Sequence, residues 1–542
     1  MTGFCNHRSG KHIRLFVLFL LFTVSLTGRF TYGAESSPVT PQEREPIALS
    51  LQEALLFALD HNLDIRVNVI EQKKTGTDVQ FYKGEFDPVI SANVPFNKQT
   101  QLTATTLQAS IEEEAETVIN AYRQEIFDFA MNFTKKFSIG GIMDVDFGLR
   151  RFDTTVLFYN IDPSFPSNLS FSYRQPLLKN FGRDVNRRNI VISQNNMEIS
   201  GHQFKQQVID ALNDVQSRYW DLVFMEQDYK SKEEALDLAL KHLERNRIQV
   251  DIGTLAPIEI SQSKYNVAQR EEDIIRAEAA LDNARDRLKA ALNVAASDQG
   301  WDVLISAKDY PTVPGTAELI DLDEAIETAL KNRPDFQQQK IDILNRTIIQ
   351  KYQRNQTLPD LEFQASYGWT GLGGDLYGPD PETGDRILVD EGGLADSFDR
   401  LFSGDYPTWR IGLNVSYPIF NNAAKASRAR AELDLHQAMV QQELLKQQII
   451  MEVREAARAI ESNRKGYDKA KQAMELAEEQ LNAEQRKFEV GTSTNFQVLE
   501  YQRELTGAAT NEVAARIEYI KSTYYFEKVL GTFLDECDIQ IK

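Results

Sequence analysis

The stretch of sequence that decides the fold runs from Val208 to Val250 and reads VIDALNDVQSRYWDLVFMEQDYKSKEEALDLALKHLERNRIQV. An apolar or aromatic residue recurs in it every seven positions, at Val208, Val215, Leu222, Tyr229, Leu236, Leu243 and Val250. A sustained seven-residue repeat indicates helices that supercoil against neighbouring helices. A helix from about Asn189 to Val250 is ~90 Å long at 1.5 Å per residue, which no ordinary globular core requires.

The same spacing returns later in the chain, at Val453, Ile460, Tyr467, Met474, Leu481 and Phe488. Each run ends at a Gly-Thr pair, Gly253-Thr254 in the first case and Gly491-Thr492 in the second. Glycine takes the backbone conformation that ends a helix, so we interpret both pairs as hairpin tips rather than points within a continuous rod.

The chain contains an internal repeat. SLQEAL at 50–55 resembles DLDEAI at 321–326, QPLLKN at 175–180 resembles YPIFNN at 417–422, and DIGT at 251–254 resembles EVGT at 489–492. Three matches in the same order predict a structural duplication. Both halves then contain a short helix, two alternating stretches, a proline and a long helical hairpin.

Alternating stretches predict strands at about 87–98, 140–152, 168–178, 359–370 and 408–420, each with one apolar and one polar face. An antiparallel sheet on a soluble core has this pattern, and so does a membrane barrel with lipid outside and water inside. Aromatic residues at the strand ends, such as Trp369 and Trp409, favour the membrane. The segment Gln99–Lys136 is additional and is expected to be helical in part, at Ile111–Glu116. Either it is an inserted excursion, or Met143–Arg150 extends the first hairpin. The stretch Gly371–Tyr406 is rich in Gly, Asp and Pro and is expected to be an exposed external loop.

Composition limits the class of protein. The chain has 542 residues, 42% of them apolar, and a net charge of −20. These values exclude a polytopic helical membrane protein and disfavour nucleic-acid binding. The N-terminus has Arg8, Lys11 and Arg14 before the apolar run Leu15–Phe22. This pattern favours a secretory signal peptide over a membrane anchor, because the run is shorter than the ~20 residues that span a bilayer.

We therefore divide the chain into consecutive parts. The signal peptide is 1–34, a flexible segment is 35–46, the first repeat is 47–315, the second repeat is 316–534, and the C-terminal tail is 535–542. The hairpin tips are expected near residues 253 and 491.

This arrangement resembles the outer-membrane efflux protein family, the TolC-like exit ducts, from about Ile47 to Leu534. The resemblance implies a homotrimer that is mainly α-helical with a membrane β-barrel part. Each chain gives four strands to a shared twelve-strand barrel in a Gram-negative-type outer membrane, and long helical hairpins form a tunnel across the periplasm. The hairpin tips are then expected to meet a periplasmic adaptor (membrane fusion) protein, which couples the duct to an inner-membrane pump or ABC exporter.

Site residues follow from the resemblance. The tip residues expected to contact the adaptor are Gly253, Thr254, Leu255, Gly491, Thr492 and Ser493. The acidic gate positions of the family correspond to Gln497 and Glu500, so one of the two is neutral. A solvated glutamate on a helix surface is the alternative interpretation of Glu500. Ser493 stands where the family has a basic residue.

The expected function is a passive outer-membrane exit duct for efflux or type I secretion. The alternatives are a secreted or periplasmic structural coiled-coil tether and a periplasmic adaptor. We predict no enzyme, no cofactor, no metal site and no nucleic-acid partner, because no nucleophile elbow, phosphate loop or metal-spaced histidine pair occurs. The sequence does not identify the transported substrate.

Overall fold

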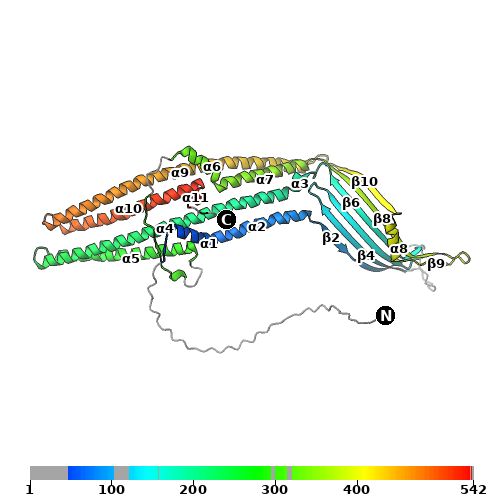
Figure 1. Cartoon of the computed structure of the whole chain (residues 1–542), viewed down its shortest axis with the longest axis horizontal. Coiled ribbons are helices and arrows are strands. Elements are labelled where there is room, and N and C mark those ends of the chain that lie inside the picture. The colour runs from blue at the N-terminus through cyan, green and yellow to red at the C-terminus, as the bar shows by residue number, and fades with distance from the viewer. Residues whose placement is uncertain are drawn as a thin grey trace, which may run out of the picture. The chain divides into compact units, whose positions relative to one another are not determined.

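The computed structural model describes residues 47–102, 121–156, 158–294, 300–313, 320–537 and 539 (Figure 1). The predicted signal peptide at 1–34 and the helix expected at 111–116 lie outside these residues.

The helices follow the same order in both halves, which confirms the duplication. The first half has α1 (Leu51–His61), α2 (Leu63–Lys83), α4 (Arg188–Asp251) and α5 (Ile258–Leu292); the second has α6 (Leu322–Asn332), α7 (Pro334–Gln356), α9 (Asn422–Glu489) and α10 (Asn495–Leu530). Shorter pieces are α3 (Arg183–Asn186), α8 (Leu394–Ser403), α11 (Phe533–Glu536), η1 (Gly84–Phe86) and η4 (Gly300–Asp302). The helix α1 begins at a capping box in which Ser50 and Glu53 satisfy each other's backbone N–H groups.

The seven-residue seam forms the core of the helical part. Val208, Val215 and Leu222 are fully buried, as is Val453 on the second long helix. The helix α4 packs on α5, α9 packs on α10, and α4 also packs on α10. The two hairpins therefore form one coiled-coil bundle, with a larger core around α1, α4, α5 and α10 and a second around α6, α9 and α10.

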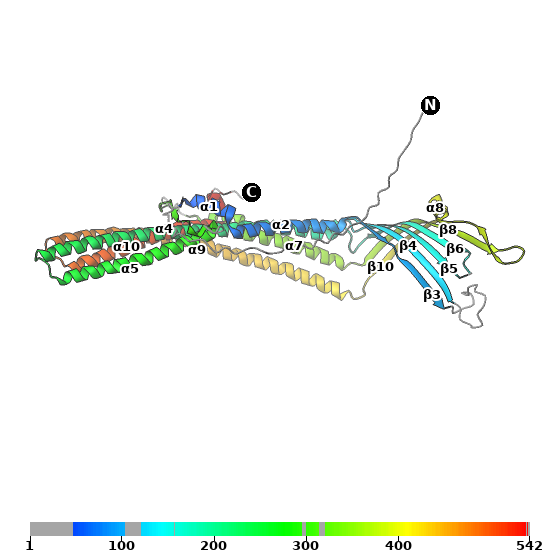
Figure 2. The same ribbon diagram turned by 90° about the horizontal axis from the view of Figure 1, so that it is seen from below.

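Closer to the sheet, the helices form a single layer. The helix α2 packs on α4, α4 on α7, and α7 on α9 (Figures 1 and 2). The edge helices of this layer are therefore α2, which leads into the first strands of the sheet, and α9, which follows the last strand.

The large sheet is antiparallel throughout, with the order β10-β8-β6-β5-β4-β2 among the described residues. Its strands are β2 (Val89–Asn93), β4 (Ala121–Lys136), β5 (Ile142–Thr154), β6 (Ile161–Pro176), β8 (Asp360–Pro379) and β10 (Pro407–Ser416). The strand β3 (Phe96–Leu102) continues the β2 edge along β4, and β9 (Arg386–Asp390) pairs with the end of β8. A small separate sheet joins β1 (Ile47–Leu49) to β7 (Ile305–Ala307).

The sheet is wider than expected. Alternation gave five strands and the resemblance implied four, but six strands follow one another along the described sheet. The strand left out was β4, which lies within the segment Gln99–Lys136. Its residues Phe127, Phe129, Met131 and Phe133 do alternate with Asp128, Ala130 and Asn132, so the signal was present in the sequence.

The region between Gly371 and Tyr406 also differs from the expected external loop. The strand β8 extends to Pro379, and α8 lies against β8 and β6. Two glycines make this contact possible: a Cβ on Gly371 lies 2.1 Å from the Ser397 carbonyl oxygen, and one on Gly373 lies 2.1 Å from that of Gly393. The Ser167 and Ser397 hydroxyls form a hydrogen bond of 2.7 Å, which also holds α8 against the sheet.

We predict that Gly371→Val detaches α8 from the sheet, because the new side chain occupies the space of the Ser397 backbone. Trypsin cleavage after the exposed Arg400 then becomes faster in the folded protein. The matched control is Gly412→Val, since a Cβ on Gly412 meets no atom within 4 Å. Equal cleavage rates for the two variants would contradict this role for Gly371.

Candidate functional site

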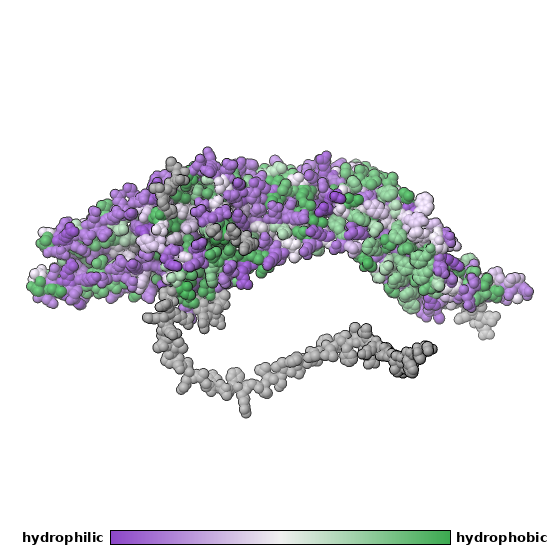
Figure 3. Space-filling model, viewed as in Figure 1, coloured by the Kyte–Doolittle hydropathy of each residue, from purple (hydrophilic) through white to green (hydrophobic). Residues whose placement is uncertain are grey.

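One face of the large sheet is apolar across all six strands. The residues on it are Ile90 and Ala92 of β2; Phe127, Phe129, Met131 and Phe133 of β4; Met143, Val145, Phe147 and Leu149 of β5; Leu169, Phe171 and Tyr173 of β6; Phe363, Ala365, Tyr367 and Trp369 of β8; and Trp409, Ile411, Leu413 and Val415 of β10. Many are solvent-exposed, with Ile411 at 66% and Val415 at 71%. Figure 3 shows this apolar surface over the sheet. A contiguous exposed apolar patch marks a membrane or protein contact.

The opposite face is polar and carries linked charges. Thr134 donates to Asp144 at 2.6 Å, Arg174 pairs with the same carboxylate at 3.3 Å, and Arg150 pairs with Asp128 at 2.5 Å. Such groups require water or each other as partners. A sheet that is apolar on one side and polar on the other has the pattern of a membrane barrel wall with a wet interior.

Charged residues limit the apolar face at both ends. On β4, Glu125 and Lys135 flank the run Phe127–Phe133. Glu125 pairs with Lys98, and the Lys135 ammonium donates to the Phe86 carbonyl. Seven residues at ~3.3 Å each give an apolar run of about 23 Å along the strand. In the described part of the chain, no helix has both the length and the apolar character to cross a membrane.

The two hairpin tips have nearly the same geometry. Gly253 and Gly491 have φ angles of 80° and 76°, which favour glycine. The following threonines close the turn: the Thr254 N–H donates to the Gln249 carbonyl at 2.9 Å, and the Thr492 N–H donates to the Lys487 carbonyl at 2.9 Å. The predicted Gly-Thr residues therefore build the turns.

Apolar side chains beside these turns are exposed. Ile252, Ile258, Val490 and Phe496 each expose more than 60% of their surface, whereas Leu255 is half-buried. The sequence analysis singled out the Gly-Thr pairs but missed these neighbours. For Ile252 and Val490 the signal was an apolar residue directly before each glycine.

The three remaining predicted residues lie at the start of α10. Gln497 completes a capping box with Thr494, whose N–H donates to the Gln497 side chain at 3.3 Å. Glu500 pairs with Arg503 at 3.2 Å and lines a groove of about 440 Å³ beside Phe496 and Tyr265. Ser493 donates a hydrogen bond to the Glu484 carboxylate. This bond, together with a second one from Lys487 to the same carboxylate, lowers the pKa of the Glu484 carboxyl.

A buried polar cluster joins the two hairpins close to their tips. Asn495 of α10 accepts a hydrogen bond from Asn246 of α4 at 2.9 Å and donates to Glu259 of α5 at 2.7 Å. His242 of α4 also contacts the Asn495 Oδ1 atom through its Nε2 atom, and the Asn246 amide nitrogen lies 3.3 Å from the same ring nitrogen. Asn246 donates further to Ser263 at 2.8 Å. The sequence analysis did not identify this cluster.

Burial lowers the pKa of His242 below its ordinary value of 6.5, and the nearby Arg245 acts in the same direction. The hydrogen bond to Asn495 and the charge of Glu259 oppose this shift. The neutral imidazole is therefore the form that the folded bundle favours.

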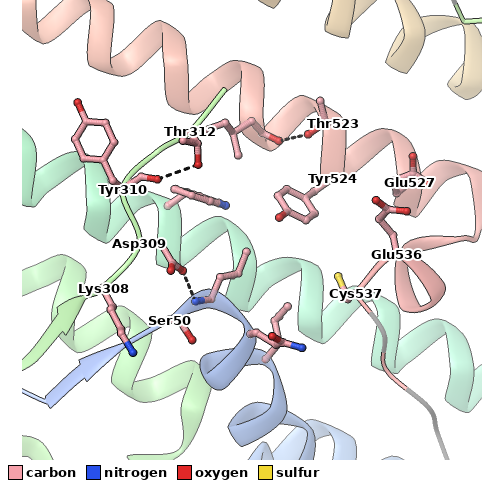
Figure 4. A pocket seen from close by; sticks show the side chains of 15 residues that line it. Ser50, Lys308, Asp309, Tyr310, Thr312, Thr523, Tyr524, Glu527, Glu536 and Cys537 are labelled. Atoms are coloured by element: carbon pink, nitrogen blue, oxygen red, sulfur yellow. Dashed lines mark hydrogen bonds between the residues drawn. The ribbon is translucent and has the colours of Figure 1, made fainter. Parts of the chain in front are cut away.

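A cavity of about 910 Å³ lies at the opposite end of the bundle from the tips, between α1, α10 and the C-terminal segment (Figure 4). Asp309 at its edge accepts hydrogen bonds from the Leu51 N–H at 2.6 Å and the Tyr219 hydroxyl at 2.9 Å. Burial raises the pKa of the Cys537 thiol to about 11, so this thiol is protonated at neutral pH. The cavity wall is thus held by contacts that fix the start of α1.

Comparison with known proteins agrees with this geometry. The chain has the fold of outer-membrane channels. It is 16% identical to the Campylobacter jejuni CmeC outer membrane channel, with a TM-score of 0.58 over 89% of this chain and 86% of that chain. It is 14% identical to the Vibrio cholerae outer membrane protein VceC, with a TM-score of 0.57 over 89% of this chain and 96% of that chain. It is 15% identical to the open state of the Neisseria gonorrhoeae MtrE outer membrane channel, with a TM-score of 0.55 over 89% of each chain.

One family model matches the second half of the chain. Residues 325–532 match the model of the outer membrane efflux protein family, which confirms the resemblance noted from the sequence. No curated protein sequence matches the chain.

We predict that Asn495→Ala loosens the contact between the hairpins. The substitution leaves a buried donor on Asn246 without its acceptor and removes the partner of the His242 ring, at a cost of about 1–3 kcal/mol. The midpoint of thermal unfolding, followed by helical circular dichroism, should fall. Asn463→Ala, which removes a half-buried asparagine of α9 with one long, solvent-exposed hydrogen bond of 3.4 Å to the Glu518 carbonyl, should change it little.

We also predict that acid weakens this contact. As the pH falls below about 6.5, the unfolded chain takes up a proton on His242 that the buried ring resists, so stability decreases. The unfolding midpoint, measured from pH 8 to pH 5, should fall less in His242→Gln than in the unaltered protein. Parallel curves for the two proteins would rule out His242 as a source of the pH dependence.

Proposed function

We propose that three copies of this chain form a passive exit duct in a Gram-negative-type outer membrane, with the helical part crossing the periplasm. The observation that carries the proposal is the two-faced sheet, apolar on one side and polar on the other, whose two edge strands each lack a partner on their outer side within the described ranges. A cleaved signal peptide at 1–34 and repeats at 47–315 and 316–534 belong to this proposal.

The open edges require further copies of the chain. In lipid, each unpaired backbone group costs several kcal/mol, so only closed barrels and helices span a bilayer. Among the residues that the structure describes, the outer edges of β10 and β2 have no strand partner. Copies arranged in a ring remove these edges by pairing each β10 with the next β2.

The helical layer has matching unpartnered edges. On α2, Leu63, Val67 and Ile70 form one exposed apolar stripe, and Leu433, Val440 and Leu444 form another on α9. Both stripes have the spacing of a single helix face. Packing α9 of one copy on α2 of the next covers both stripes. The number three comes from the resemblance to the efflux duct family.

The hairpin tips are the proposed contact for a periplasmic adaptor protein. Ile252 and Ile258 on one tip, with Val490 and Phe496 on the other, offer exposed apolar anchors around the turn residues Gly253, Thr254, Leu255, Gly491, Thr492 and Ser493. The adaptor would link the duct to an inner-membrane pump or ABC exporter, which supplies the energy for efflux or type I secretion.

Gln497 and Glu500 are the proposed gate positions. Threefold symmetry brings three Glu500 carboxylates around the axis, where they attract cations. We predict that Glu500→Gln lowers the cation preference of the channel in planar bilayers, because Arg503 loses its partner and remains positive. Glu272→Gln, which breaks a similar surface pair with Arg276, is the control. An unchanged ion preference in Glu500→Gln would leave Glu500 as a solvated surface residue.

A secreted coiled-coil tether or a periplasmic adaptor does not account for the apolar face of the sheet. Fractionation followed by native mass measurement separates these functions. We expect the protein in the outer-membrane fraction, soluble only in detergent, at three times the mass of the mature chain. A monomer released without detergent contradicts the duct.

A further inference from the structure

The strands β4 and β5 belong to the wall of the sheet. They pair continuously from Gln124 opposite Thr154 to Lys136 opposite Ile142. The strand β4 then pairs with β2 and β3, while β5 pairs with β6. This hairpin therefore lies between the two outer parts of the sheet and is not an excursion from one edge.

Both faces continue across the hairpin in phase. On the apolar face, Phe133 lies opposite Val145, which lies opposite Phe171 and then Tyr367. On the polar face, the neighbouring row is Thr134, Asp144, Ser172 and Ser366. All six strands thus meet the requirement that one side faces lipid and the other faces water.

The two edges of the six-strand sheet are complementary. An even number of alternating strands makes β10 antiparallel to β2, so β10 of one copy meets β2 and β3 of the next in the antiparallel sense. The lengths also agree, since β10 has 10 residues and faces an edge made of 5 residues in β2 and 7 in β3. Every residue of β2 is exposed, and every residue of β10 except Gly412 is exposed.

The width of six strands also suits the helical layer that joins the sheet. Four helices at about 9–10 Å spacing occupy ~36–40 Å of a ring per copy. Six strands spaced ~4.8 Å apart and tilted by ~40° occupy about 38 Å, whereas four occupy about 25 Å. The length of barrel wall formed by six strands therefore matches the length of ring formed by the layer α2-α4-α7-α9 in each copy.

We propose that the shared barrel has eighteen strands, six from each copy, and that β10 seals against β2 and β3 of the neighbouring copy. The proposal rests on the trimeric duct proposed above. Barrel diameter grows about linearly with strand number, so this bore is about 1.5 times that of a twelve-strand barrel. Barrels of 16–18 strands leave an aqueous channel, so the barrel passes bulky solutes and selection among them falls to the hairpin tips.

Disulfide trapping tests which strands meet between copies. In a Cys537→Ser background, Ile411→Cys on β10 is combined with Ile90→Cys, Ala92→Cys or Phe96→Cys on the β2–β3 edge. The matched control combines Ile411→Cys with Val145→Cys on β5, the edge strand if the β2–β4 part lies outside a twelve-strand barrel. All these positions lie on the apolar face.

We expect oxidation to link the copies into disulfide-bonded trimers for the β10–β2 pairs but not for the β10–β5 pair. The reverse result overturns the eighteen-strand barrel and leaves the trimer intact. Particles that are monomers by native mass instead overturn the trimeric duct itself. Imaging of the unaltered trimer in lipid nanodiscs then counts the strands directly: eighteen supports the proposal, and twelve contradicts it.

Discussion

The unpaired backbone groups along the outer edges of β10 and β2 are the constraint on which the rest of the structure depends. A sheet with an exposed apolar face is suited to lipid, yet lipid offers no partner for a free N–H or C=O group. One chain cannot satisfy both conditions, whereas a ring of copies can. The helical layer also has unpartnered edges. The exposed apolar stripes lie on α2 and α9, the two edge helices, which are joined in sequence to these edge strands. In the proposed duct, assembly of copies rather than the fold of one chain therefore completes the core.

The duplication explains how one chain builds both parts. Each half supplies strands and then a helical hairpin that ends in the same glycine–threonine turn. The long helices bury a seven-residue seam within one copy, so each hairpin is stable along its length. At the tips the two hairpins are held by hydrogen bonds around Asn495 rather than by a large apolar core. Polar contacts of this kind depend on geometry and on protonation.

Much of the fold followed from local periodicity. The heptads, the Gly-Thr tips and most of the alternating strands are encoded within short windows, where a period of seven or two is visible. The strand β4 was missed although Phe127–Phe133 alternates, because the acidic segment before it suggested a helix and an inserted excursion. The packing of α8 on the sheet depends on Gly371. Its sequence surroundings predict a loop, and only the pairing of β8 with β6 shows that it lies in a strand. The cluster of His242, Asn246 and Asn495 joins residues about 250 positions apart, and no local pattern encodes such a contact.

The most direct test of the duct is single-particle imaging of the mature protein extracted from outer membranes in mild detergent. The proposed duct predicts a hollow particle with threefold symmetry, a detergent belt around the sheet, and a helical tunnel on the order of 100 Å long, set by helices of 64 and 68 residues. A monomer, or a rod that is soluble without detergent, would contradict the assignment of the apolar face to lipid.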